Sequence, residues 1–282
     1  MSEEALSFLA IRPGGIFVDA TAGMGGHTGL IARRLSTGLV IANDRDAESL
    51  ELARRNTADC AGRIRFLQVK FSELAETIRE AGYDKVDGLV ADLGVSRYQL
   101  TAAERGFSFM VDGPLDMRMT ATEGMTAAEL VNQSAEKAIA DWIFQLGQER
   151  SARKIARALV RARPIRSTRH LADVVERAVP RAGHRLHPAT KTFMALRMVV
   201  NDEPGELDSL LETAPGLLKP GGRMVVISFM SSEDRKVKEK FRELGRDGRA
   251  RILTRRPLQP SQAEIAANPP SRSAKMRAME WI

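Results

Sequence analysis

The 282-residue sequence is poor in cysteine, in aromatic residues and in long apolar runs. Its single cysteine, Cys60, excludes a disulfide framework and is typical of a reducing compartment, so we expect a cytoplasmic location. No apolar run approaches the length of a membrane span, and residues 1–10 are too acidic and too short for a signal peptide, so we expect no membrane partner. The histidines, at positions 27, 170, 184 and 187, lack metal-like spacing with carboxylates, and we therefore expect no metal site.

Positive charge is in excess, and it is unevenly distributed. The formal net charge is +7 and the isoelectric point is about 9.8. Residues 133–191 contain thirteen Lys or Arg against five acids, and residues 235–282 again contain thirteen against five. Because both blocks lie outside the first hundred residues, the pattern suggests a neutral cofactor-binding half and a basic half that holds an anionic substrate, with nucleic acid as the first candidate.

The apolar pattern of the first hundred residues predicts alternating strands and helices. Short apolar runs at 16–21, 39–44, 64–68 and 86–93 predict buried strands, and Asp46 is the expected N-cap of a helix at 47–56. This alternation predicts a parallel, doubly wound α/β sheet.

Helical periodicity then continues without strands before the α/β pattern resumes. Further helices are expected at 28–35, 127–130, 135–146, 152–162, 168–179, 190–200, 206–218 and 232–244, and further strands at 223–229 and 251–254. We therefore expect a sheet domain in two parts, 1–103 and 204–282, the second with a basic C-terminal tail. An all-helical domain at 104–203 would interrupt it.

A glycine-rich turn at 19–29 follows the first expected strand. Gly23, Gly25 and Gly26 would let a bound nucleotide approach the backbone, and the next helix N-terminus would add N–H donors. Asp44 closes the second strand, where an acid typically accepts hydrogen bonds from ribose hydroxyls. The turn lacks the third glycine of the dinucleotide fingerprint, which favours S-adenosylmethionine and leaves a nicotinamide oxidoreductase as a distant alternative.

Two further residues of this turn are candidates for cofactor binding. Asp19 could bind the ammonium group of the methionine moiety, or it could instead cap the turn that follows it. His27 is expected to shape the loop around the cofactor rather than to hold a metal.

A long loop follows the fourth expected strand and carries three unusual segments. They read ADLGVS at 91–96, ERGFSF at 104–109 and DGPLDMRM at 112–119. Ligands of open α/β sheets lie outside the carboxyl ends of strands, and loops of this length are usually functional, so we expect the chemistry here. Its aromatic residues could stack on a base or pack within the loop, and its arginines could hold phosphates or pair with acids; they are Tyr98, Phe107, Phe109, Arg105 and Arg118.

These segments resemble the MraW/RsmH family of bacterial ribosomal-RNA methyltransferases, which methylate N4 of a cytidine in the decoding region of small-subunit rRNA. The resemblance extends to HPAT at 187–190, ALRMVVN at 195–201, the ISF segment at 227–229 with Ser231 and residues 233–235, and SRSAK at 271–275. It implies a Rossmann-like class I fold with an all-helical insertion, S-adenosylmethionine as cofactor, and 16S rRNA of the small ribosomal subunit as partner. It also suggests a homodimer.

The resemblance also assigns site residues. The family's cofactor contacts map onto Gly25, Gly26, His27, Asp44, Phe71, Asp92 and Gln99. Phe71 could cover the adenine or pack in the core, and Gln99 could reach the cofactor from the loop. Our hypothesis for catalysis is that Asp92 and nearby carbonyls accept a hydrogen from N4, while Ser96 or Asp116 orients the base.

The expected RNA contact is the basic part of the helical insertion. Its residues are Arg150, Arg153, Lys154, Arg157 and Arg161. The alternative is a solvated helix face, but as a block these residues should make binding strongly dependent on salt.

Several positions depart from the family pattern. Arg97 stands where the family usually has a second serine, Thr120 where it has an acid, and Met230 where it has a histidine. The family's His-x-Pro-Val segment is not found ahead of the first strand. These differences keep two alternatives open: a ribosome-binding factor with weakened catalysis, and a methyltransferase for another nucleic acid.

Overall fold

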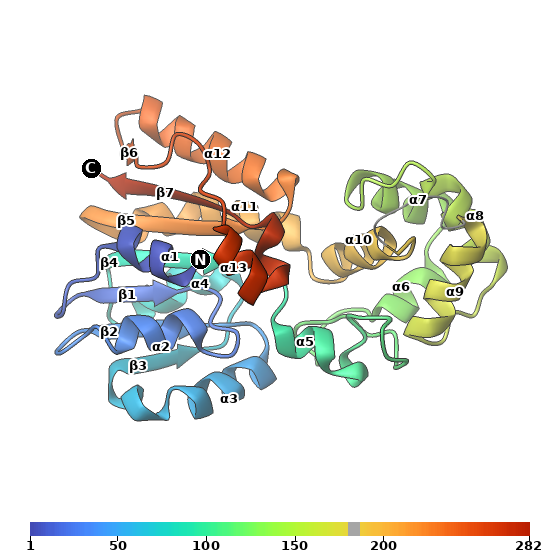
Figure 1. The fold of residues 1–282 in the computed structure, drawn as a ribbon, viewed down its shortest axis with the longest axis horizontal. Coiled ribbons are helices and arrows are strands. Elements are labelled where there is room, and N and C mark those ends of the chain that lie inside the picture. The colour runs from blue at the N-terminus through green and yellow to red at the C-terminus, as the bar shows by residue number, and fades with distance from the viewer. Residues whose placement is uncertain (180–186) are drawn as a thin grey trace. The chain divides into compact units, whose positions relative to one another are not determined.

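The computed structural model describes residues 1–179 and 187–282, so His184 falls outside the described residues. The chain forms two compact units, one made of Met1–Gly94 with Pro204–Ile282 and the other of Val95–Glu203 (Figure 1). The first junction lies earlier than the 103/104 boundary expected from the sequence, because the short helix α5 (Arg97–Thr101) belongs to the second unit. Among the described helices, none is long and apolar enough to cross a membrane.

The first unit is built on one sheet, in which the described residues contribute seven strands in the order β3-β2-β1-β4-β5-β7-β6 (Figure 1). The strands are β1 (Ile16–Asp19), β2 (Leu39–Asn43), β3 (Ile64–Leu67), β4 (Val86–Asp92), β5 (Leu218–Ser228), β6 (Ala250–Ile252) and β7 (Lys275–Trp281). Neighbours from β3 to β5 pair in parallel, whereas β7 is antiparallel to both β5 and β6. The Rossmann-like α/β class is confirmed, but the sheet is not wholly parallel as the sequence pattern predicted.

Helices cover both faces of this sheet. They are α1 (Ser2–Leu9), α2 (Gly26–Ala32), α3 (Ala47–Asn56), α4 (Phe71–Glu80), α11 (Glu203–Thr213) and α12 (Ser231–Arg246). The short helix α13 (Gln262–Ala267) buries none of its residues. Successive residues of a strand point to opposite faces, so β5 supplies Val225 to the cluster under α1 and α2, and Val226 to the cluster under α4, α11 and α12. This two-sided burial explains the continuous apolar runs at 89–91 in β4 and 224–227 in β5.

Strand β7 was not predicted from the sequence, and its charged residues are the reason. Met276 and Ala278 join the cluster on the α1 side, while Met279 faces the opposite cluster. Arg277, between them, is 6% exposed and is held by Asp234 of α12. A segment with a basic residue at an inward-facing position does not have the apolar pattern of a buried strand, although here the charge is neutralised by a partner from α12.

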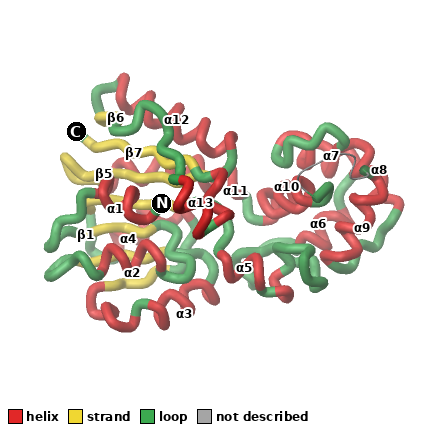
Figure 2. The backbone as a smooth tube through the Cα atoms, viewed as in Figure 1, coloured by secondary structure: helices red, strands yellow, loops and turns green. Residues whose placement is uncertain are grey.

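The second unit consists of helices and loops, and strands are drawn only in the first unit (Figure 2). Its helices after α5 are α6 (Ala127–Gln133), α7 (Glu136–Gln145), α8 (Ala152–Arg161), α9 (Thr168–Ala178) and α10 (Thr190–Val200). They enclose a core of their own that includes Ile139, Ile155 and Leu196. The predicted helices of the insertion agree with these bounds to within a few residues, because each carries one apolar stripe at helical spacing.

Candidate functional site

Three acids lie where parallel strands of the first unit end. Strand β1 ends at Asp19, β2 ends one residue before Asp44, and β4 ends at Asp92. Because β1 pairs with both β2 and β4 in parallel, the three acids come to the same edge of the sheet. This carboxyl edge is where open α/β sheets bind ligands.

Asp19 is 1% exposed and fastens the glycine-rich turn. Thr28 Oγ1 donates to Asp19 Oδ2 over 2.6 Å, and the backbone N–H of Thr21 donates to Oδ1 over 3.2 Å. Burial raises the pKa of this carboxyl, and the charge of His27 opposes the rise. The capping alternative therefore accounts for both oxygens, and a contact with a cofactor ammonium stays a prediction.

Backbone hydrogen bonds orient the carboxylate of Asp44. Its Oδ2 accepts from the backbone N–H of Gly23 over 2.8 Å, and its Oδ1 accepts from Asp46 N over 3.0 Å. Burial raises the pKa of Asp44 to about 6. Each carboxylate oxygen has a second lone pair, so the two backbone hydrogen bonds orient the group and leave each oxygen able to accept another hydrogen bond. Asp46 accepts from the backbone of Glu48 and caps α3, as predicted.

The glycines of the turn have different physical roles. Gly25 has a φ of 88°, and a Cβ there would lie 3.0 Å from Thr57 Cγ2 and 3.2 Å from Ala53 Cα, so packing and backbone conformation both require glycine. At Gly26, the first residue of α2, a Cβ would meet no protein atom within 4 Å. Gly26 therefore keeps backbone accessible at a helix N-terminus, as a bound anion or nucleoside requires.

Two buried polar atoms at this edge have no hydrogen-bond partner among the described residues. They are Asp92 Oδ1 and His27 Nε2. Burial raises the pKa of Asp92 to about 6, opposed by His27 and reinforced by Asp19. Leaving a buried polar group unpaired costs about 1–3 kcal/mol, and such groups concentrate at functional sites. The pair fits a ligand that offers both hydrogen-bond donors and acceptors.

Two scaffold residues of this edge were missed by sequence reasoning. Thr21 Oγ1 accepts from the backbone N–H of Asp92 over 2.7 Å, which joins the turn after β1 to the end of β4. Asn43 is 1% exposed and donates from Nδ2 to Ala20 O and Val69 O, while its Oδ1 accepts from Val69 N. A polar residue that ends an apolar strand was the available signal for Asn43.

Phe71 begins α4 and packs, partly buried, against the main core of the first unit. This contact agrees with the core-packing alternative. A contact with an adenine ring stays a prediction.

The other predicted site residues belong to the second unit. Ser96 caps α5 in a reciprocal arrangement: its Oγ accepts from Gln99 N over 3.2 Å, and Gln99 Oε1 accepts from Ser96 N over 2.9 Å. Gln99 is 3% exposed, so it is not the solvated loop residue that it would be taken for in isolation. The capping box fixes both side chains, and it leaves the Ser96 hydroxyl hydrogen able to donate.

Asp116 is engaged by the arginine two residues later. Arg118 donates from Nε to Oδ1 and from Nη2 to Oδ2, both over 2.8 Å. Burial alone would raise the pKa of Asp116, but the hydrogen bonds and charge of Arg118 hold it below its usual value. Asp116 therefore stays ionised and is better suited to orient a group than to take up a proton.

The rest of the long loop is packed rather than open. Arg105 is 6% exposed and donates to the carbonyls of Arg118 and Met119, so it supports the loop. Phe107 lies in the core of the second unit, and the Phe109 ring lies 4.6 Å from the ring of His187. The alternatives of internal pairing and loop packing therefore hold for these residues.

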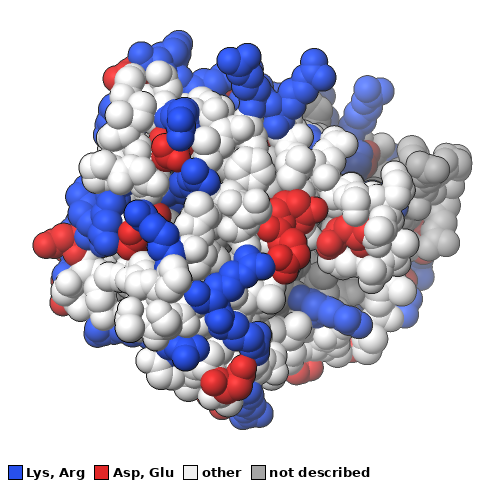
Figure 3. Space-filling view, turned by 60° about the vertical axis from the view of Figure 1, so that its left-hand side comes forward, with Lys and Arg blue, Asp and Glu red and all other residues white. Residues whose placement is uncertain are grey.

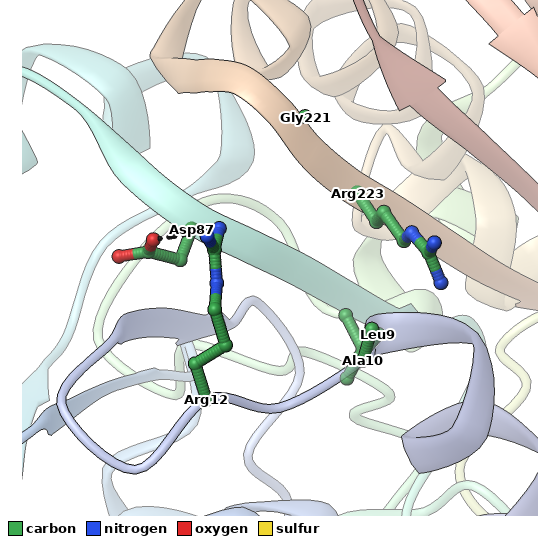
Figure 4. Close-up of a pocket in the computed structure, with 6 residues that line it drawn as sticks. All are labelled: Leu9, Ala10, Arg12, Asp87, Gly221 and Arg223. Carbon is green, nitrogen blue, oxygen red and sulfur yellow. Dashed lines mark hydrogen bonds and ion pairs between the residues drawn. The ribbon is translucent and has the colours of Figure 1, made fainter.

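A hollow of about 280 Å³ lies at the opposite edge of the sheet, where β4 begins (Figure 4). Its lining is Leu9, Ala10, Arg12, Asp87, Gly221 and Arg223. Arg12 and Lys219 both bind the carboxylate of Asp87, which leaves that acid fully paired. No predicted site residue lines this hollow, and it lies at the wrong strand ends for a nucleoside cofactor.

Helix α8 presents the expected basic surface. Its buried residues Ala152, Ile155, Ala156 and Leu159 form one stripe. The five basic residues predicted to hold RNA, named above at positions 150–161, are all exposed. Arg157 lies 3.6 Å from Glu136, and both side chains are solvent-accessible, so this pair neutralises little of the surface.

Comparison with known proteins relates the whole chain to methylases. A sequence model of the MraW methylase family matches residues 1–282. Ribosomal RNA small subunit methyltransferase H of Solibacter usitatus is 69% identical over 280 residues, which are 99% of this chain and 98% of that protein. The protein of the same name from Acidobacterium capsulatum is 49% identical over 287 residues, with coverage of 99% and 96%. A solved rRNA methylase from Streptococcus thermophilus aligns over 100% of this chain and 93% of its own, at 13% identity and a TM-score of 0.47.

Proposed function

The chain belongs to the MraW methylase family, and from this premise we propose that it methylates N4 of one cytidine in the decoding region of 16S rRNA. It is an S-adenosylmethionine-dependent methyltransferase, and relatives at 69% and 49% identity are named for small-subunit rRNA. The choice of cytidine and of N4 rests on the resemblance of the segments at 91–119. We place the reaction on a small subunit in the cytoplasm, with a homodimer as the accompanying prediction.

The observation that carries the proposal is the buried, unpaired carboxylate oxygen of Asp92. Its Oδ1 is buried and unpaired at the end of β4, beside the glycine-rich turn that would hold the methyl donor. A methyltransferase for an exocyclic amine needs an acceptor at such a place, because the N4 lone pair is delocalised into the ring until the amine pyramidalises. A carboxylate that accepts an N4 hydrogen stabilises this change selectively in the transition state.

The carboxyl edge also fits the cofactor. Asp44 would accept from the ribose hydroxyls, Gly26 would allow close approach of the nucleoside, and Asp19 with His27 would face the methionine part. Bound S-adenosylmethionine supplies an electrophilic methyl group on a sulfonium. No covalent intermediate with the chain is needed.

We assign the chain's own part in the reaction to positioning and to proton acceptance. Asp92 holds an N4 hydrogen and takes up the proton that the amine loses when it gains the methyl group, and solvent then receives this proton. Ser96 and the Asp116–Arg118 pair orient the base, and Gln99 completes the cofactor contacts from α5. Because Arg118 keeps Asp116 ionised, we give proton acceptance to Asp92 alone.

RNA binding is assigned to the basic face of α8. Figure 3 shows basic side chains spread over the visible face of the molecule, with fewer acidic ones among them. The net charge of +7 supports an anionic partner. Neutralisation of several phosphates by α8 makes binding weaken steeply as salt is raised.

Methyl transfer from labelled S-adenosylmethionine tests the proposal directly. Purified small subunits, protein-free 16S rRNA and duplex DNA are offered in parallel, and the modified nucleoside is identified by mass spectrometry. We expect N4-methylcytidine at a single rRNA position. Transfer to DNA instead would favour the methyltransferase for another nucleic acid, and cofactor binding without transfer would favour the assembly factor with weakened catalysis.

The substitution Asp92→Asn tests whether Asp92 is the proton acceptor, without changing the shape of its side chain. The amide preserves shape but cannot take up a proton, so kcat should fall by roughly 10²- to 10⁴-fold. Asp84→Asn, an exposed acid just before β4, is the matched control and should be unchanged. Full activity of a folded Asp92→Asn protein would remove Asp92 from the mechanism.

A further inference from the structure

The exit of β5 lies beside the exit of β4 in the first unit. Asp92 is paired in register with Ile227, and the backbone N–H of Leu93 donates to Ile227 O over 2.9 Å. Phe229 follows two residues later, and its Cδ2 lies 3.9 Å from the position that a Cβ on Gly94 would occupy. The Phe229 ring therefore lies against the backbone immediately after the acceptor carboxylate.

Two acids of α12 hold this turn in place. Glu233 is 7% exposed, and its Oε2 accepts from the backbone N–H groups of Phe229 over 3.1 Å and Met230 over 3.0 Å. Asp234 accepts from Arg277 Nε over 2.6 Å and Nη2 over 3.2 Å. The first acid fixes the backbone that carries the ring, and the second ties the start of α12 to β7.

Burial of the Asp234–Arg277 ion pair carries a desolvation cost. The side chains of Arg277 and Asp234 are 7% and 14% exposed, and an ion pair so far from water gains little net stability over an apolar replacement. What a paired and fully hydrogen-bonded arrangement provides is a single conformation of the residues attached to it. Here those residues are the ones that flank Phe229.

Besides Phe71, which the family resemblance assigns to the cofactor, Phe229 is an aromatic group at this edge. Phe107 is buried in the second unit and Phe109 packs on His187 and Phe193. Phe229, in contrast, is only partly buried against the α1-side cluster. Proteins that act on an unstacked base usually replace its lost stacking with an aromatic face.

We infer that Phe229 contacts the target base next to Asp92, and that Glu233 and the Asp234–Arg277 pair are positioning residues for its ring. This inference rests on the proposed function, since it needs a base at the carboxyl edge. It adds a base-contacting residue from the second part of the sheet domain, distant in sequence from the loop at 91–119.

Substitution of Phe229 tests the contact. Phe229→Leu keeps an apolar side chain but removes the aromatic face, and we expect kcat/KM for small subunits to fall by roughly five- to a hundredfold. Phe229→Tyr keeps the face and should stay within about twofold of the wild type. Calorimetric binding of S-adenosylhomocysteine should be unchanged in both variants.

Phe8→Leu is the matched control, because Phe8 of α1 packs partly buried against the same cluster. Its carbonyl accepts from Arg223, in the middle of β5 rather than at its exit. We expect Phe8→Leu to alter Tm but not kcat/KM. A Phe229→Leu protein with wild-type kcat/KM, or a Phe8→Leu protein that loses as much, would overturn the inference.

A double-mutant cycle tests the positioning role. Glu233→Ala should lower kcat/KM in the wild-type background but have no further effect in Phe229→Leu, because both act through one ring. Glu233→Gln, which keeps an acceptor for the two N–H groups, should restore most of the rate. Fully additive losses would contradict the positioning role, whereas a wild-type protein that transfers no methyl group would contradict the proposed function itself.

Discussion

Replacement of Gly26 by alanine should separate cofactor binding from stability. A methyl group at Gly26 meets no protein atom within 4 Å, and the residue is the first of α2, so the free protein gains helix propensity at no steric cost. We expect the free energy of unfolding to rise by up to about 1 kcal/mol, which corresponds to roughly 2–4 °C in Tm. If the nucleoside approaches this backbone, the same methyl group crowds it at a cost of about 1–3 kcal/mol, and affinity falls roughly five- to a hundredfold.

The assay pairs thermal unfolding with calorimetric titration of S-adenosylhomocysteine. Gly25→Ala is the contrasting variant: with a φ of 88° and contacts at 3.0 and 3.2 Å, it should lose stability by about 2 kcal/mol. Opposite signs in the two measurements for Gly26→Ala identify a ligand surface. Unchanged affinity in a stabilised Gly26→Ala protein would refute the assignment of this turn to the cofactor.

Two further predictions concern pH and the long loop. Folding raises the pKa of Asp44 and Asp92 to about 6, so their contribution to the stability of the free protein is complete below about pH 4 and is lost as pH rises through 6. Cofactor affinity should instead strengthen as pH rises over the same interval, because the ionised carboxylates are the forms that bind. Calorimetric unfolding and calorimetric titration at constant ionic strength measure the stability and the affinity. Stability and affinity that do not change with pH would contradict this prediction. Asn201→Ala should destabilise the second unit by about 3 kcal/mol, because Asn201 Nδ2 donates to Met117 O and its Oδ1 accepts from Met119 N, each over 2.7 Å. Denaturant unfolding measures this loss, and a variant as stable as the wild type would contradict it.

Much of the fold follows from local sequence patterns. The apolar runs that predicted β1 to β4 are short and bounded by turns, and the stripe in α8 has helical spacing, so neither needs knowledge of distant residues. Strand β7 differs because Arg277 is compatible with a buried strand only when Asp234 lies opposite it. The two residues are far apart in sequence, and no local pattern reveals their pairing.

Some features of the candidate site also follow from local sequence, whereas others depend on tertiary packing. Asp19, Asp44 and Asp92 could be placed at one edge because each lies at or near the end of a predicted parallel strand. The burial of Gln99 and the roles of Thr21 depend on tertiary packing, and sequence reasoning missed both. The end of a strand can be predicted from the local amino-acid sequence, but the hydrogen-bond partners of the residues at that end cannot.

Asp92 and Asp116 show how far local sequence can separate acids of different function. Asp116 is followed two residues later by Arg118, and that spacing alone permits the bidentate pair that the structure contains. Asp92 is followed by Leu93, Gly94 and Val95, none of which can neutralise a carboxylate. Its Oδ1 therefore reaches the folded state unpaired, with its pKa raised to about 6 by burial. Asp116, whose pKa is lowered by Arg118, cannot take up a proton near neutral pH. Asp92 is therefore the one proton acceptor that we assign to residues 92–118.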